Sequence, residues 1–219
     1  MLIKRNNSRN NRSRMKFPIL VSSLLVAVSA LNAQAPATPL AVKVDIKRVT
    51  VTEQQTPQFN ASNVKEPRWR PKNWIQVDVE FDVKVPASAG GREGSYSALQ
   101  MDIYLGLNQK SKDGKFQALK GTLNLVNVPA GECHALAFVS PASMKAILQR
   151  DNVTASSDIQ AWGVDVKAEG QRADADASNG KPWWEGGAEI VFLDGTLLNK
   201  AQTPFAPLWG DYDVPVQAK

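Results

Sequence analysis

The feature that most constrains the fold is a stretch of strict alternation between apolar and polar residues. Over residues 74–85 the odd positions carry Ile, Val, Val, Phe, Val and Val, whereas the even positions after Trp74 carry Gln, Asp, Glu, Asp and Lys. A period of two places all apolar side chains on one face of a β-strand, while a helix would scatter them around its circumference. We therefore predict a strand with one buried face, and a solvated polar face that carries Asp78, Glu80 and Asp82.

Further strand-like segments follow, separated by turn residues. They cover residues 40–51, 99–107, 116–128, 133–139, 159–168 and 188–192. A slip in the alternation near Lys47 and Arg48 predicts a β-bulge in the first segment, and Asp113-Gly114 is a typical hairpin turn. Residues 169–182 have the composition of a polar loop.

One short helix is expected. Ser140 suits the N-cap and Pro141 the first helical position of a helix that ends near Arg150. Strands and helices do not alternate along the chain, which disfavours a parallel α/β sheet. The sequence therefore predicts an all-β fold, namely an antiparallel immunoglobulin-like β-sandwich with one short helix, formed as a single domain by residues 34–219 with an irregular C-terminal tail.

The beginning of the chain predicts a secretory signal peptide. A basic start, with either Met1 or Met15 as the initiator, precedes an apolar run over residues 17–31 and the small residues Ala33 and Ala35. We place cleavage after Ala33, so that residues 1–33 are removed. The run is short for a membrane span, and no transmembrane segment is expected after cleavage. The protein is then exported to the periplasm, the outer surface or the medium.

The net charge of +5 comes from this leader. Six of the 26 Lys and Arg residues lie in residues 1–33, where no acid occurs, which leaves 20 basic against 21 acidic residues in the exported part. Nucleic-acid binding relies on an excess of basic residues. Nucleic acid is therefore not expected as a partner.

Cys133 and His134 are the single cysteine and the single histidine of the chain. An internal disulfide and a zinc cluster of His and Cys ligands are therefore excluded. Neighbouring residues on a strand point to opposite faces, so thiol and imidazole would not meet as a nucleophile and its base. We expect Cys133 to be a buried structural thiol and the protein not to be an enzyme.

Four oxygen-bearing residues have the spacing of a calcium-binding loop. Asp174, Asp176, Ser178 and Glu185 fall at positions 1, 3, 5 and 12 of such a loop. However, position 6 is Asn179 rather than glycine, and no flanking helices are expected. A plain solvated loop is the favoured alternative to calcium, and no other cofactor is indicated.

Two groups of loop aromatics are candidates for contact with a ligand or partner. Trp183 and Trp184 lie beside acidic and amide residues, a combination that can cover the apolar face of a sugar. Trp69 lies between Arg68 and Arg70, and aromatic residues with Arg are enriched at interfaces. A solvated loop, an acidic glycan and a neighbouring subunit all remain open for the second group.

The order of several strand motifs resembles a known family. The motifs are WIQVDVEF at residues 74–81, YLGL at 104–107, LKGTL at 119–123, VNVPAG at 126–131 and HALAFVSP at 134–141. They resemble secreted immunoglobulin-like proteins that are encoded beside type IV pilus genes in mucin-dwelling Verrucomicrobia. The resemblance spans residues 40–170. It implies a sandwich fold, an envelope or extracellular location, and pilus or envelope subunits, including further copies of the chain, as partners; it transfers no catalytic residue.

Two functions are consistent with these observations. The first is a non-enzymatic structural or accessory protein of a type IV pilus-like surface assembly. The alternative is a carbohydrate-binding or adhesive module that uses the loop tryptophans. A secreted hydrolase ranks last, because one histidine, one cysteine and no convincing carboxylate pair leave little material for catalysis.

Overall fold

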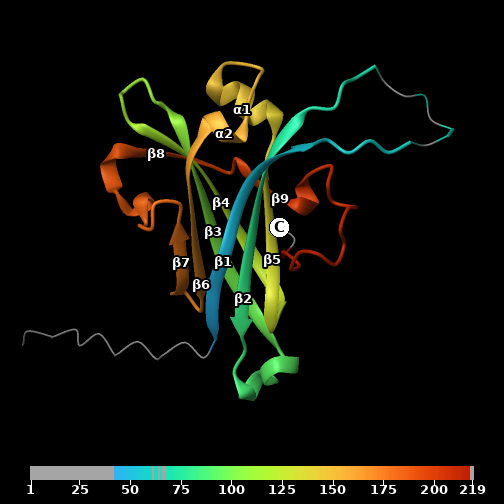
Figure 1. The fold of residues 1–219 in the computed structure, drawn as a ribbon, viewed down its shortest axis with the longest axis vertical. Coiled ribbons are helices and arrows are strands. Elements are labelled where there is room, and N and C mark those ends of the chain that lie inside the picture. Colours follow the sequence, from blue (N-terminus) through green and yellow to red (C-terminus); the bar gives the residue numbers. More distant parts are fainter. Residues whose placement is uncertain (1–41, 61, 64, 66–67, 218–219) are drawn as a thin grey trace, which may run out of the picture. The chain divides into compact units, whose positions relative to one another are not determined.

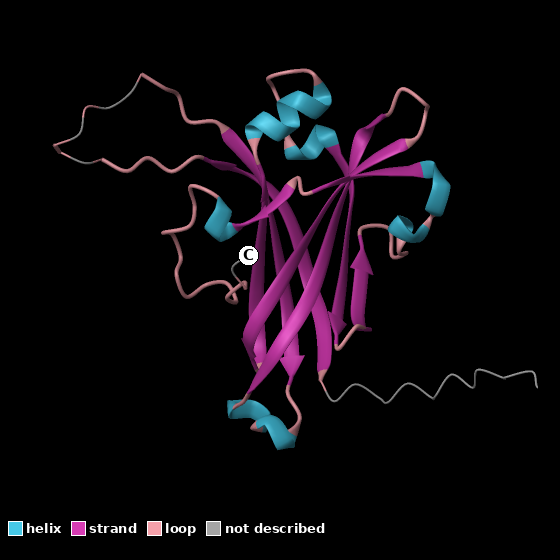
Figure 2. Cartoon of the chain, turned by 180° about the vertical axis from the view of Figure 1, so that it is seen from behind, coloured by secondary structure: helices cyan, strands magenta, loops and turns pink. Residues whose placement is uncertain are grey.

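The computed structural model describes residues 42–60, 62–63, 65 and 68–217. The expected signal peptide and its cleavage site lie outside these residues. The described chain forms two β-sheets that pack face to face (Figures 1 and 2). The predicted β-sandwich is therefore confirmed.

The first sheet has four antiparallel strands. In spatial order they are β1 (Lys43–Gln55), β2 (Asn73–Lys84), β5 (Gly131–Val139) and β9 (Leu197–Asn199). The apolar face of β2 is buried as the alternation predicts, since Ile75, Val77, Val79, Phe81 and Val83 are each at most 2% exposed. The predicted bulge in β1 is also present, as a register shift between Ile46 and Arg48.

The second sheet has five strands. Their order is β7 (Gln171–Ala177), β6 (Ile159–Ala168), β3 (Ser95–Lys110), β4 (Phe116–Pro129) and β8 (Ile190–Asp194). All neighbours are antiparallel except β8, which runs parallel to β4. The prediction of a loop over residues 169–182 is wrong for the first half of this range, which forms β7. Its charged residues alternate with alanines, a pattern with weak strand propensity that pairing with β6 overrides.

Short helices cap both ends of the sandwich (Figure 2). Helices α1 (Pro141–Leu148) and α2 (Ala155–Asp158) lie at one end, and two 3₁₀ turns, Ala87–Ala89 and Gly91–Glu93, lie at the other. The predicted N-cap is confirmed, because the Ser143 amide donates to Ser140 Oγ at 3.0 Å. Further 3₁₀ turns cover Trp183–Glu185, Gly187–Glu189 and Lys200–Gln202.

The C-terminal segment, residues 200–217, closes the seam between β5 and β4. Phe205 is fully buried and stacks on Phe138, with ring centroids 4.7 Å apart. The Val214 amide donates to the His134 carbonyl at 2.8 Å, and the Val126 amide donates to the Pro215 carbonyl at 2.9 Å. The segment therefore bridges one strand of each sheet, which no local pattern in the sequence indicates.

The same segment covers part of the polar face of β2. Tyr212 donates its hydroxyl to Asp78 Oδ2 at 2.6 Å, and its ring stacks on His134 at 4.3 Å. Nδ1 of His134 lies 3.0 Å from Asp78 Oδ1. Burial and the hydrogen bond to Asp78 raise the pKa of Tyr212 to about 12. The expectation of a fully solvated acidic face is therefore wrong at Asp78.

Two buried carboxylates lie side by side on the outer face of the five-stranded sheet. Asp102 and Asp165 are directly paired across β3 and β6 and are 4% and 2% exposed. Lys167 Nζ lies 2.6 Å from Asp102 and 3.7 Å from Asp165, and Thr122 donates to Asp102 at 2.6 Å. Burial alone would raise the pKa of Asp102, but the hydrogen bonds from Lys167 and Thr122 outweigh it and lower the pKa.

Replacement of Lys167 should therefore destabilise the protein. In Lys167→Met the Asp102 carboxylate stays buried without its cation, and we expect a loss of about 3 kcal/mol in the free energy of unfolding. Denaturant unfolding at pH 7 measures the loss, with the exposed Lys112→Met as control. The pKa of Asp102 is lowered in the folded state, so the difference should shrink as the pH falls and Asp102 becomes protonated. A loss below 0.5 kcal/mol, roughly the effect of an ordinary surface change, would contradict this account.

Candidate functional site

A groove on the outer face of the five-stranded sheet, which we call the aromatic groove, is the candidate binding site. Gly106 of β3 is paired with both Ala118 of β4 and Ala161 of β6, so the smallest side chains lie at one level across three strands. Their neighbours Leu105 and Leu119 point into the core and are fully buried. The small floor leaves a hollow of about 510 Å³.

The 3₁₀ turn Trp183–Glu185 forms the wall of the groove, and Trp184 packs this turn against the sheet. A Cβ at Gly163 would lie 2.2 Å from the Trp184 ring, so glycine is required there. Trp184 stacks on Tyr104, with centroids 5.0 Å apart and an interplanar angle of 6°, and is only 7% exposed. The expected ligand contact of Trp184 is therefore corrected to a packing role.

Trp183 is half-buried and lines the groove. Its Nε1 donates to the Trp162 carbonyl at 3.1 Å, and its ring meets Tyr104 edge-on at 6.3 Å. Its Cη2 atom is 3.5 Å from the place of a Cβ on Gly106. The ring is thus held in one orientation before any ligand arrives, which lowers the entropic cost of binding.

Mainly neutral polar side chains surround the hollow. They are Gln117, Gln160, Ser178 and Asn179, with Glu189 as the charged member. Gln160 is the extra residue of a β-bulge, because Ala161 pairs with Gly106 and Ile159 with Leu107. Bulges redirect side chains and often occur beside functional sites. Sequence reasoning missed Gln160, since the apolar and polar residues around it show no slip in alternation like the one near Arg48, and this bulge appears only in the pairing of β6 with β3.

Arg172 fastens the turn to the sheet. Its guanidinium donates to both Asp165 carboxylate oxygens at 2.9 and 2.8 Å and also contacts Glu185 Oε1 at 2.7 Å. A bidentate pair fixes direction as well as distance. Glu185 therefore helps to position the turn that carries Trp183.

The structure does not bring the four expected calcium ligands together. Asp174 and Asp176 lie on β7, and Asp174 Oδ2 accepts a hydrogen bond from the Ile46 amide of β1 at 2.7 Å. Ser178 Oγ accepts from the Trp162 amide at 3.2 Å, and Glu185 is paired with Arg172 on the outer face. Within the described ranges, no group of three or more His, Cys, Asp or Glu residues is arranged to hold a metal ion.

Cys133 and His134 point to opposite faces of β5, as predicted. Cys133 is 4% exposed, and burial together with the charges of Asp82 and Glu132 raises the pKa of its thiol to about 11. The thiol is therefore protonated at neutral pH and a poor nucleophile. His134 lies on the other face, against Asp78.

Arg68, Trp69 and Arg70 lie on the connection between β1 and β2, which extends away from the sandwich (Figure 1). All three are exposed, Trp69 by 49%. The base of the connection is closed by the Thr56 amide, which donates to the Lys72 carbonyl at 2.9 Å. The exposed or half-buried aromatic candidates therefore fall into two separate places, Trp69 on this connection and Trp183 in the aromatic groove.

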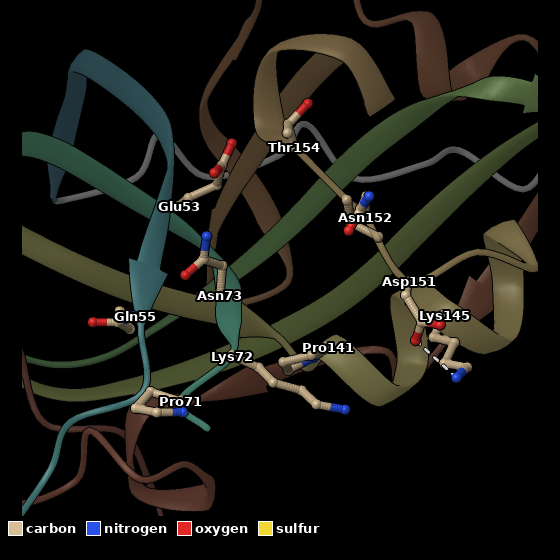
Figure 3. Close-up of a pocket in the computed structure, with 11 residues that line it drawn as sticks. Glu53, Gln55, Pro71, Lys72, Asn73, Pro141, Lys145, Asp151, Asn152 and Thr154 are labelled. Carbon is tan, nitrogen blue, oxygen red and sulfur yellow. Dashed lines mark ion pairs between the residues drawn. The ribbon is translucent and has the colours of Figure 1, made fainter. Parts of the chain in front are cut away.

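A second hollow, of about 520 Å³, lies between the base of this connection and α1 (Figure 3). Its charged side chains are largely engaged by the protein itself. Lys145 and Asp151 form an ion pair at 2.7 Å, and Glu53 accepts from the Ala155 amide at 2.8 Å. The hollow is therefore a weaker candidate than the aromatic groove.

The packing of Trp184 against Gly163 can be tested by adding one methyl group at position 163. Gly163→Ala should displace the ring and cost about 1–3 kcal/mol of stability, the usual effect of overpacking. Near-UV circular dichroism and denaturant unfolding report the displacement and the cost. Gly210→Ala is the matched control, since nothing lies within 4 Å of a Cβ there. Equal spectra and stabilities for the two variants would contradict the proposed seat.

Comparison with known proteins identifies relatives of the fold. A protein-family model matches residues 35–219, so the chain belongs to that family. The crystal structure of a protein from Akkermansia muciniphila matches with a TM-score of 0.69 and 24% sequence identity, and the match covers 81% of this chain and 94% of that one. This similarity shows a shared fold. A search of curated protein sequences finds no match.

No helix in the part of the chain that the structure describes is long and apolar enough to span a membrane.

Proposed function

From the chain's membership of this family we propose that it is a non-enzymatic structural or accessory protein of a pilus-like surface assembly. The observation that carries the proposal is Trp69, which is 49% exposed between Arg68 and Arg70. Exposed tryptophan and arginine supply much of the binding energy at protein interfaces. The sequence motifs that resemble secreted immunoglobulin-like proteins encoded beside pilus genes support the same assignment.

A second exposed aromatic residue lies on the connection between β1 and β2. Phe59 lies on the same connection and is 62% exposed, the highest value among the large apolar residues that the structure describes. Arg68, Arg70 and Lys72 give the connection a positive charge that favours an acidic partner surface. We propose a pilus or envelope subunit, or a second copy of the chain, as that partner.

Export to the cell envelope or beyond is part of the proposal. It rests on the signal-peptide pattern, and the family match begins at residue 35, just after the proposed cleavage at Ala33. The absence of an enzymatic role rests on the protonated thiol of Cys133 and on the engagement of His134 by Asp78 and Tyr212.

Shearing and fractionation of native cells tests the assembly role. We expect the protein to co-fractionate with sheared surface filaments. Trp69→Ala should reduce the filament-bound fraction severalfold, because the substitution removes an aromatic side chain that the interface with the partner would bury. Trp209→Ala, which truncates a tryptophan of similar exposure elsewhere, is the control. A protein confined to the soluble periplasmic fraction, or equal behaviour of both variants, would refute the proposal.

Carbohydrate binding is the second candidate function, and the aromatic groove favours it. The fixed ring of Trp183 can cover the apolar face of a sugar, while Gln160, Asn179 and Gln117 can bond its hydroxyl groups. The groove lies on the five-stranded sheet, whereas Trp69 lies on a connection between two strands of the four-stranded sheet. The two functions are therefore compatible in one molecule.

Truncation of Trp183 tests this second function. On an array of neutral glycans, Trp183→Ala should weaken binding by at least about tenfold, a loss of about 1.4 kcal/mol. Trp69→Ala should leave glycan binding unchanged, because Trp69 lies outside the groove. If the native protein binds no glycan, or if both variants bind as well as the native protein, the groove is not a sugar site.

A further inference from the structure

The aromatic groove continues around the edge of the five-stranded sheet. A third hollow, of about 560 Å³, lies between β1 and β6, and we call it the seam hollow. Three residues line both hollows, namely Gln160, Ala161 and Ser178. The two hollows therefore meet along the first residues of β6.

The free edge of β6 explains this continuity. The ladder between β6 and β7 begins at the pair Gly163 and Ala177, so residues 159–161 extend beyond the last residue of β7. Farther along the seam, Asp174 of β7 binds the Ile46 amide of β1 and draws the two sheets together. The seam is thus tied at one end and open at the end where it joins the groove.

The chemistry of the two linings is similar. Each contains one carboxylate, Glu189 in the groove and Glu53 in the seam hollow, and neither includes Lys or Arg among the described residues. Each also contains a tryptophan, Trp183 and Trp162 respectively, and several hydroxyl or amide groups. Such a path suits a ligand with many hydroxyl groups and no negative charge, since an anion would meet carboxylates without a cation.

We propose that the aromatic groove and the seam hollow form one extended site for a linear, neutral oligosaccharide that crosses the edge of β6 at Gln160. This rests on the carbohydrate-binding function proposed above and adds the charge and length of its ligand. One sugar unit of the oligosaccharide lies against Trp183, and the sugar units that follow it occupy the seam hollow.

Calorimetric titration with oligosaccharides of two to six units tests the extended site. The probes are β-1,4-linked glucose, β-1,4-linked N-acetylglucosamine and β-1,3-linked galactose oligomers. We expect the affinity for at least one series to rise at least tenfold from the disaccharide to the pentasaccharide. Gln160→Ala should remove most of this gain, measured as the ratio of the pentasaccharide affinity to the disaccharide affinity.

A matched pair of variants blocks the seam hollow alone. Ser156 lines the seam hollow, whereas its neighbour Ser157 lines neither hollow, and both are exposed on α2. Ser156→Trp should therefore abolish the gain with chain length, and Ser157→Trp should preserve it. Near-UV circular dichroism of each variant verifies folding, and Gln160→Ala supplies the same readout if Ser156→Trp does not fold.

The outcomes separate this proposal from the function on which it rests. If no oligomer binds the native protein, both carbohydrate binding and the extended site are refuted. If short and long oligomers bind equally, or if Ser156→Trp keeps the gain with length, the site is confined to the aromatic groove and the extended site is refuted alone. A gain that depends on Gln160 and Ser156 supports it.

Discussion

The seat of Trp184 on Gly163 is the contact on which the outer face of the five-stranded sheet depends. A side chain at position 163 would collide with the ring at 2.2 Å, and the ring in turn is fixed by stacking on Tyr104. Only when Trp184 is seated can Trp183 stand beside the small floor at Gly106 and bond the Trp162 carbonyl. Glycine at position 163 thus makes room for the wall of the groove, and the small residues at Gly106, Ala118 and Ala161 make room for the hollow beside it.

The two sheets meet along two edges of the sandwich, and these two seams differ in structure. The chain closes one of them with its own C-terminal segment, which binds the His134 carbonyl of β5 and the Val126 amide of β4. The other is tied by Asp174 and remains open beside the free edge of β6. A sandwich needs closed seams for stability but can use an open one for binding, because the exposed strand edge lies next to apolar side chains.

The sequence allowed prediction of those elements whose signal is local. Strict alternation located β2, the slip near Arg48 located the bulge of β1, and Ser140-Pro141 located the start of α1. Strand β7 was missed because its stability comes from pairing with β6 rather than from its own residues. Trp183 and Trp184 are adjacent in sequence and similar in chemistry, and only the distant Gly163 decides that one is buried and the other lines a groove.

The surface-assembly account is tested most directly by site-specific photo-crosslinking in native cells. A photoreactive residue in place of Trp69 should form a crosslink to a filament or envelope subunit, or to a second copy of the chain. The same residue in place of Trp209, which is similarly exposed, should not. Crosslinks from position 69 alone are the predicted result; no crosslink from position 69, or equal crosslinking from both positions, would contradict the account.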